Sequence, residues 1–266
     1  MFVGPCTQPV PLDRVTTMRV QQPIVALVFA VVSAWGQRQG PLPGGPGGTP
    51  LTPRAGALID LTGYWASVVP EDLRFRMFTP AKGDFAGIPL NADGTKLAKE
   101  WDAAKDETSS EQCKSYGAAA IMGVPGRFHI TWDNDTTLKI ETEAGMQTRL
   151  LHFNAAPPQT EVPSWQGYSV AAWDPTLKHG MQGGGSLKVT TTNLRPGYLR
   201  KNGVPYSGKT TVTEYYDLVH EPDGAVLVVN TKVEDPTYLA EPFRTSTNLR
   251  RQRSTSGWNP SPCSAR

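Results

Sequence analysis

Residues 60–65, Asp-Leu-Thr-Gly-Tyr-Trp, begin an alternating run of side chains. Leu61, Gly63 and Trp65 fall on one face of an extended chain and Tyr64 on the other, because successive side chains of a β-strand point to opposite sides. A glycine on such a strand lets a neighbouring backbone approach closely, and the large indole of Trp65 can fill the closed end of a barrel. We interpret this stretch as the first strand of an antiparallel β-barrel.

The second half of the chain repeats this alternating pattern in short runs separated by turn residues. In the clearest case Phe128, Ile130 and Trp132 alternate with polar residues, and residues 133–135 then form a tight turn. The pattern predicts a mainly β fold, an up-and-down antiparallel barrel of about eight strands whose interior is filled or holds one small ligand. A two-sheet sandwich is the alternative. The strand-like runs are residues 128–132, 138–142, 146–153, 165–173, 187–194, 212–220, 226–233 and 243–249.

A helical insertion is expected at residues 89–116, directly after the first strand. Asn91 precedes a run of good helix formers and is a suitable N-cap. Leu97 and Trp101 lie four residues apart, so they share one face of that helix. Residues 109–116 add a further turn or two of helix. We expect these helices to cover one end or one side of the barrel.

The N-terminal region predicts export. Arg19 precedes an apolar run at residues 23–32 and then small residues, as in a secretory signal peptide, which we assign to residues 1–36 with Met18 as the expected start of translation. The apolar run is shorter than the roughly 20 residues of a membrane-spanning helix. The expected location is therefore periplasmic or secreted, with no stable membrane span after cleavage.

The remaining boundaries follow from composition. Residues 37–56 are dominated by glycine and proline and predict a disordered linker. The barrel domain then extends over residues 57–252, and a basic C-terminal tail occupies residues 253–266.

Two cysteines remain once a signal peptide carrying Cys6 is removed. Cys113 and Cys263 can form a disulfide in an oxidising compartment, or remain two separate thiols. A catalytic cysteine is the weaker alternative, because no obvious base lies near Cys113 in the sequence.

The composition argues against several classes of function. Lys+Arg number 26 and Asp+Glu number 24, a balance that does not suggest a nucleic-acid-binding protein. The chain has no common nucleophile, phosphate-loop or zinc-protease motif. Its four histidines show no metal-ligand spacing, and residues 133–135 fit a hairpin turn better than a calcium loop. We therefore expect no metal and no cofactor.

One polar grouping suggests chemistry. If the segments around Tyr198 and Glu214 pair, then Tyr198, Arg200 and Glu214 converge at one mouth of the barrel. An arginine can hold a ligand carboxylate with two hydrogen bonds, an enclosed glutamate can transfer a proton, and a tyrosine adds a neutral donor. These groups suffice for lyase or isomerase chemistry on a small unsaturated acid. The alternative is a cross-strand salt bridge beside stacked tyrosines.

Three stretches together carry a resemblance to known proteins. They are residues 60–65, Leu194-Arg195-Pro196-Gly197-Tyr198, and Val233-Glu234-Asp235-Pro236 with Pro242-Phe243. The set resembles a group of exported bacterial proteins of unassigned function and covers most of the chain after the linker. Gly63 and Trp65 also resemble the opening motif of lipocalins and related calycins, which implies a lipocalin-like barrel.

The preferred hypothesis is an exported barrel that binds a small hydrophobic or amphipathic ligand, with Trp65, Trp132, Tyr168 and Tyr216 as the expected contacts. The second hypothesis is a cofactor-independent lyase or isomerase that uses Tyr198, Arg200 and Glu214. The third is a non-catalytic interaction module of the cell envelope, whose barrel is filled.

Overall fold

A computed structural model describes residues 50–69, 79–153, 155–156, 162–176, 184–255 and 257–265. All of them belong to the unit formed by residues 41–266. The expected signal peptide and most of the expected linker lie outside these ranges.

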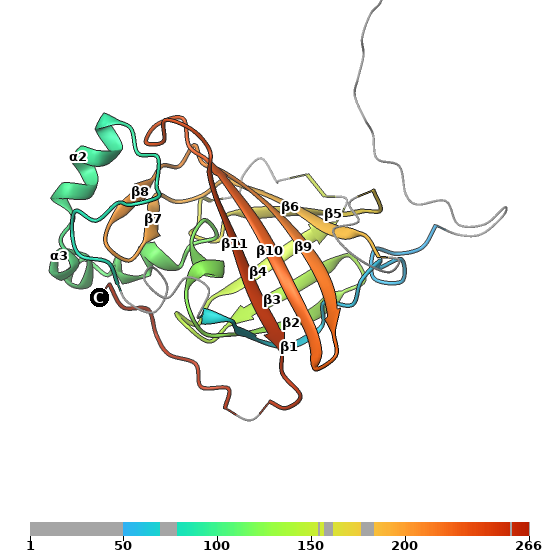
Figure 1. The fold of residues 1–266 in the computed structure, drawn as a ribbon. Coiled ribbons are helices and arrows are strands. Elements are labelled where there is room, and N and C mark those ends of the chain that lie inside the picture. Colours follow the sequence, from blue (N-terminus) through green and yellow to red (C-terminus); the bar gives the residue numbers. More distant parts are fainter. Residues whose placement is uncertain are drawn as a thin grey trace, which may run out of the picture. The chain divides into compact units, whose positions relative to one another are not determined.

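Nine strands form a closed barrel, in which each strand is hydrogen-bonded to two neighbours. Figure 1 shows the ring, which the first strand closes by pairing with both the second and the last. The prediction of a mainly β, closed barrel is confirmed, with nine strands in place of about eight. The strands of the barrel are β1 (Gly63–Ser67), β2 (Arg127–Asn134), β3 (Thr137–Thr142), β4 (Thr148–Phe153), β5 (Tyr168–Asp174), β6 (Ser186–Thr192), β9 (Thr211–Glu221), β10 (Gly224–Glu234) and β11 (Phe243–Arg251).

The chain departs from a simple up-and-down path at two places. Strands β4 and β5 pair in parallel, with Leu151 opposite Ser169, so the prediction of a wholly antiparallel barrel is wrong here. A parallel pair needs a long crossover, and the connection between Phe153 and Tyr168 lies partly outside the described residues. Between β6 and β9 the chain leaves the barrel and forms a separate hairpin, β7 (Gly197–Arg200) with β8 (Val204–Tyr206).

The interior of the barrel is built from the side chains on one face of each strand. On β9, Val212, Glu214 and Tyr216 are all buried. They share one face because the side-chain period of a strand is two residues. Most of the interior is apolar, so it supplies the main hydrophobic core, whose largest members include Trp65, Phe128, Ile130, Leu138, Ile140, Leu151, Leu187 and Leu249.

Trp65 of the first barrel strand, β1, contacts Arg251 of the last one, β11. Its indole Nε1 donates a hydrogen bond to the carbonyl oxygen of Leu61 at 2.9 Å, and the guanidinium of Arg251 lies 4.7 Å from its ring centroid. Arg251 also contacts Asp60. Burial alone would raise the pKa of Asp60, but hydrogen bonds from Thr62 and the charge of Arg251 outweigh burial and lower it. The first and last strands are thereby tied together at this end.

Residues before β1 lie against the same end of the barrel. The indole of Trp173 donates to the carbonyl oxygen of Pro53 at 2.8 Å, and the backbone N–H of Arg54 donates to Asp135 at 3.1 Å. Residues 50–56, which the sequence analysis assigned to the linker, therefore contact the β2–β3 and β5 strands.

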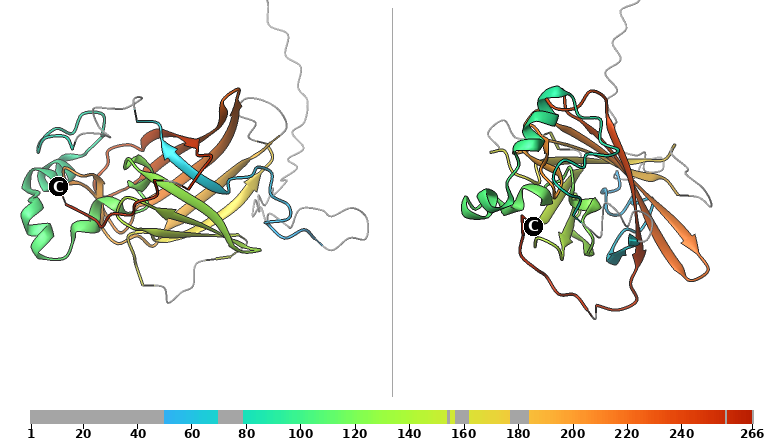
Figure 2. Two further views of the ribbon diagram at one scale, coloured as in Figure 1. Left: turned by 90° about the horizontal axis from the view of Figure 1, so that it is seen from below. Right: turned by 60° about the vertical axis from the view of Figure 1, so that its left-hand side comes forward.

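The helical insertion covers the opposite end, as the sequence predicts, and extends to residue 123. Asn91 is the N-cap, with its side chain accepting from Gly94 N–H at 2.9 Å. Tyr116, Ile121 and Met122 belong to the barrel core. Figures 1 and 2 show the helices together with the β7–β8 hairpin at this end. The helices are α2 (Ala92–Glu100), α3 (Ala103–Thr108) and the 3₁₀ helices η2 (Gln112–Tyr116) and η3 (Ile121–Gly123).

The insertion and the hairpin together form a cap with a second apolar core. This core contains Leu199, Val204 and Tyr206 of the hairpin, packed with Leu239 and Phe243 from the barrel rim. The cap therefore has an interior of its own, continuous with the end of the barrel.

Asp235 anchors the hairpin to the end of β10. Its buried carboxylate accepts hydrogen bonds from Ser207 Oγ at 2.9 Å, from Thr210 Oγ1 at 3.0 Å and from the Thr237 N–H at 2.7 Å. We expect Asp235→Ala to lower the free energy of unfolding by about 3 kcal/mol, because it leaves several buried donors unpaired. Urea unfolding measures this loss. Asp223→Ala is the control, since the Asp223 side chain is 77% exposed; an equal loss there would contradict the prediction.

The C-terminal tail runs along the surface and is fixed to the cap. Cys113 of η2 and Cys263 form a disulfide. Ser261 exchanges backbone hydrogen bonds with Glu143 and Gly145, each at 2.9 Å. Figure 2 shows the end of the tail beside the cap helices. Of the two states that the sequence left open, the structure has the disulfide.

Among the described residues, no helix combines the length and the apolar character needed to cross a membrane.

Candidate functional site

Two pockets flank the β7–β8 hairpin. The first, here called the mouth pocket, lies between the cap and the inner faces of β10 and β11 and has a volume of about 100 Å³. The second, here called the cap pocket, lies between α2, α3 and the hairpin and has a volume of about 270 Å³. Residues 199–201 line the first and residues 196–198 line the second, so β7 separates them.

The mouth pocket combines apolar walls with hydroxyl groups and two cations. Its hydroxyls include those of Thr231, Thr245 and Thr247, and Arg200 and Lys201 are its only charged lining residues in the part of the chain that the structure describes. Its apolar lining includes Pro80, Ala118, Ala119, Ala120, Met122, Val124, Pro125, Leu199 and Phe243. The pocket therefore offers both positive charge and apolar surface to a ligand.

Both cations of the mouth pocket are held by the cap. Arg200 Nη1 donates to the carbonyl oxygen of Ala86 at 2.7 Å. The ammonium of Lys201 lies 5.6 Å from the ring centroid of Tyr116, within the range of a cation–π contact. These contacts reduce the freedom of two long side chains before a ligand arrives, which lowers the entropy lost on binding.

A buried ion pair lies in the barrel beneath this pocket. Thr231, in the pocket wall, is the direct cross-strand partner of Glu214. Directly opposed residues of antiparallel strands have Cβ atoms about 5 Å apart. The carboxylate of Glu214 accepts two hydrogen bonds from Arg149, Nη1 to Oε1 at 3.2 Å and Nη2 to Oε2 at 2.7 Å. The two side chains are 1% and 0% exposed, so water does not screen the pair.

Neighbouring hydroxyl groups complete the environment of the pair. Arg149 Nη2 also donates to Ser169 Oγ at 3.3 Å and to Thr191 Oγ1 at 3.1 Å. Burial alone would lower the pKa of Arg149, but the Glu214 carboxylate outweighs burial and raises it. Burial and the charge of Glu214 both raise the pKa of Tyr216, so its phenol is neutral. The guanidinium of Arg149 is thus paired with the carboxylate of Glu214.

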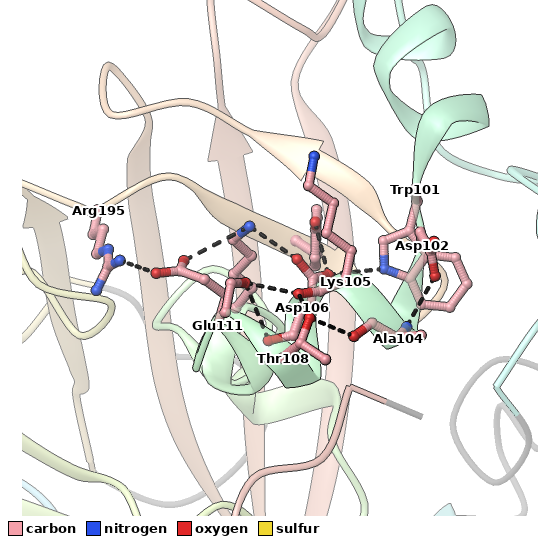
Figure 3. Close-up of polar contacts among 11 residues, drawn as sticks. Trp101, Asp102, Ala104, Lys105, Asp106, Thr108, Glu111 and Arg195 are labelled. Atoms are coloured by element: carbon pink, nitrogen blue, oxygen red, sulfur yellow. Dashed lines mark hydrogen bonds and ion pairs between the residues drawn. The ribbon is translucent and has the colours of Figure 1, made fainter.

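Asp106 organises the cap pocket, as Figure 3 shows. Its carboxylate is 5% exposed and accepts hydrogen bonds from Trp101 Nε1 at 3.2 Å, from Lys114 Nζ at 3.0 Å and from the Tyr198 hydroxyl at 3.0 Å. Lys114 also pairs with Glu111 at 3.6 Å. Asp106 therefore ties α3 to η2 and to β7.

The phenol of Tyr198 serves as a donor in this arrangement. Burial, the hydrogen bond to Asp106 and the negative charges of Asp106 and Glu111 all raise its pKa. The Tyr198 phenol therefore stays protonated at neutral pH and does not act as a base there.

The three residues expected to act together have different partners. Glu214 is inside the barrel with Arg149. Tyr198 faces Asp106 in the cap pocket, and Arg200 faces the mouth pocket, where it contacts Ala86. The predicted pairing of the two segments does not occur, because β7 pairs with β8 and β9 pairs with β6 and β10. The hairpin thereby removes Tyr198 and Arg200 from the strand that carries Glu214.

The four residues expected to contact a ligand are likewise spread over the barrel, and none lines either pocket. Trp65 and Tyr216 are fully buried inside. Trp132 packs on Phe153, with ring centroids 5.5 Å apart. Tyr168 stacks on His152 at 4.7 Å, and it lies on the outer face of β5 because its neighbour Ser169 points inward to Arg149.

Sequence reasoning missed three residues that organise these sites. Arg149 was hidden in an apolar stretch, Asp106 in a helical segment rich in charge, and Arg251 in the basic run that ends the domain. For Arg149 the signal was ambiguous, because it shares the odd-numbered face with Leu151 and Phe153 while Leu150 lies on the other face. Nothing local identified Asp106 or Arg251, whose partners lie elsewhere in the fold.

Within the described ranges, no group of three or more His, Cys, Asp or Glu side chains has the arrangement of a metal site. Comparisons of the chain with protein-family models, with curated proteins and with solved structures find no match.

Proposed function

We propose that this protein is exported and binds a small amphipathic carboxylic acid in the mouth pocket. The observation that carries the proposal is the charge of that pocket, whose only charged lining residues in the described part of the chain are Arg200 and Lys201, beside apolar walls. A carboxylate accepts hydrogen bonds well from a guanidinium or an ammonium group, and ligand pockets are mainly apolar with a few polar groups that set orientation.

The size of the pocket restricts the ligand. A volume of about 100 Å³ is below the roughly 300–1,000 Å³ of pockets for drug-sized molecules. The ligand is therefore a short-chain acid, or a longer one of which only the head group and the first few carbons are enclosed.

Two further observations support export and a lipocalin-like barrel. The disulfide between Cys113 and Cys263 suits an oxidising compartment, in agreement with the expected signal peptide. The pairing of Trp65 with Arg251 at one end of the barrel suits a lipocalin-like barrel, a fold in which a closed end and a mouth have different roles.

The test is calorimetric titration with octanoate, and with 1-octanol as its uncharged counterpart. We expect octanoate to bind and Arg200→Gln to weaken it by about tenfold or more, because a hydrogen bond to a charged group contributes about 1.5–3 kcal/mol. The 1-octanol titration should show much weaker binding that does not respond to this substitution.

Lys209→Gln is the matched control, since Lys209 is exposed and lines neither pocket. It removes the same charge and should leave octanoate binding unchanged. An equal loss in both variants would indicate long-range attraction instead of a site. The absence of octanoate binding would count against the proposal and favour an interaction module with a filled barrel.

A further inference from the structure

The cap pocket is a second candidate site, chemically unlike the mouth pocket. It is the larger of the two, with a volume of about 270 Å³. Because β7 separates the two pockets, a molecule in one does not contact the lining of the other. The cap pocket is therefore a candidate binding site separate from the mouth pocket.

Aromatic rings form the walls of the cap pocket. Trp101, Tyr198, Tyr206 and Tyr238 all line it, and they come from the insertion, the hairpin and the segment after β10. The faces of such rings attract cations. One ring already has a cation beside it, because the Lys114 ammonium lies 5.4 Å from the centroid of Tyr198.

The charges of the lining leave an excess of carboxylate. Lys114 is engaged by Asp106 at 3.0 Å and by Glu111 at 3.6 Å, so it is neutralised within the cap. The other charged lining residues are Glu100, Asp102 and Lys105, two carboxylates against one ammonium. The mouth pocket, in contrast, has only cations.

A buried phenol in the wall lacks a partner. Tyr206 is 1% exposed, and its hydroxyl has no hydrogen-bond partner among the described residues. The hydroxyl lies beside Gly197, another lining residue, where an added Cβ would come within 2.6 Å of it. Buried polar groups are normally hydrogen-bonded. The Tyr206 hydroxyl is enclosed by the protein between Gly117 and Gly197.

We propose that the cap pocket binds small organic ammonium compounds. The aromatic rings and the carboxylate of Glu100 attract the cation. A ligand of this kind uses both the aromatic walls and the excess negative charge of the pocket.

The test compares choline with 3,3-dimethyl-1-butanol, which has nearly the same shape without the charge. Both are titrated into the full-length protein purified with its disulfide intact, and binding is followed by calorimetry and by chemical shifts of the tryptophan indole N–H groups. We expect choline to bind at least about tenfold more tightly than the alcohol.

Two substitutions at Tyr238 distinguish the effect of losing the aromatic ring from an effect on folding. Tyr238→Phe keeps the ring and should leave choline affinity within about twofold, whereas Tyr238→Leu should weaken it by about threefold or more. Glu100→Gln should weaken choline as well, and Asp93→Asn, on the same helix but outside the lining, should not. Thermal melts of each variant show that the cap remains folded.

Equal binding of choline and the alcohol would overturn the proposal, as would a Tyr238→Leu variant that binds choline normally. The absence of choline binding at concentrations up to about 10 mM, where even a weak site of the order of 1 mM is filled, would do the same. None of these outcomes bears on octanoate binding, because Tyr238 and Glu100 do not line the mouth pocket.

Discussion

Arg149→Met is expected to lower the free energy of unfolding by about 3–5 kcal/mol, the usual cost of removing one partner of a buried ion pair. The substitution leaves the Glu214 carboxylate in the barrel interior without its two hydrogen bonds from the guanidinium. Methionine has a similar length and fills much of the same volume, so the loss reports on charge more than on packing. Equilibrium unfolding in urea measures it.

A double variant tests whether the loss of stability comes from the unpaired charge or from the change in packing. In the double variant Arg149→Met with Glu214→Leu no unpaired charge remains, and Ser169 and Thr191 still hydrogen-bond to each other at 2.8 Å. We expect this variant to recover most of the stability, because apolar residues of similar volume often replace a buried pair at no cost. The two substitutions must then be strongly non-additive, as expected for residues in direct contact.

The surface pair of Arg250 and Glu221 is the matched control. Its N–O distance is 3.0 Å and both side chains are 41% exposed, so water screens the pair. Arg250→Met should cost less than about 1 kcal/mol. If Arg149→Met proves as mild as Arg250→Met, the barrel interior must admit water, and the buried character of the pair is refuted.

The same region shows what the sequence can and cannot predict. Alternation identified the barrel strands and put Glu214 on the same strand face as Tyr216, but it left open whether Glu214 points into the barrel or to solvent. It could not identify Arg149 as the partner, because β4 reads Thr-Arg-Leu-Leu-His-Phe and both of its faces carry a leucine. Either face is acceptable as the inner one until the neighbouring strands are known. The structure turns Leu151 inward and leaves Leu150 exposed.

The connections between the strands could not be predicted from the sequence either. The parallel pairing of β4 with β5 leaves no mark in the alternation of either strand, because alternation is the same in parallel and antiparallel pairs. The candidate sites depend less on this pairing than on the β7–β8 hairpin. Tyr198 and Arg200 are two residues apart, so alternation alone predicts the same face for both. The register of β7 shifts between them, and Tyr198 lines the cap pocket whereas Arg200 lines the mouth pocket.

The cap helices were predictable as helices, whereas their role was not. Asn91 is a capping residue by type, and it caps as expected. Asp106 has three partners that come from the start of α3, from η2 and from β7. An acidic residue on a short helix normally faces solvent, and only the hairpin returning over α3 makes this one the centre of a polar cluster.

Replacing both Cys113 and Cys263 by serine is expected to lower the free energy of unfolding by about 5 kcal/mol. The bond joins residues 150 positions apart, and in the chain-entropy model a closed loop of that length removes about 5 kcal/mol of entropy from the unfolded chain. Urea unfolding of the double variant against the oxidised parent, both carrying Cys6→Ser, measures the difference without a stray thiol.

The structure also limits how this loss can arise. The backbone hydrogen bonds of the tail to Glu143 and Gly145 do not involve the sulfur atoms, so we expect the barrel and the cap to retain their circular dichroism. The effect therefore acts on the unfolded chain, and reduction of the parent should reproduce the double variant. A loss below about 1 kcal/mol would mean that the unfolded chain already holds these segments together, and a change in the native spectrum would mean that the tail is part of the folding core.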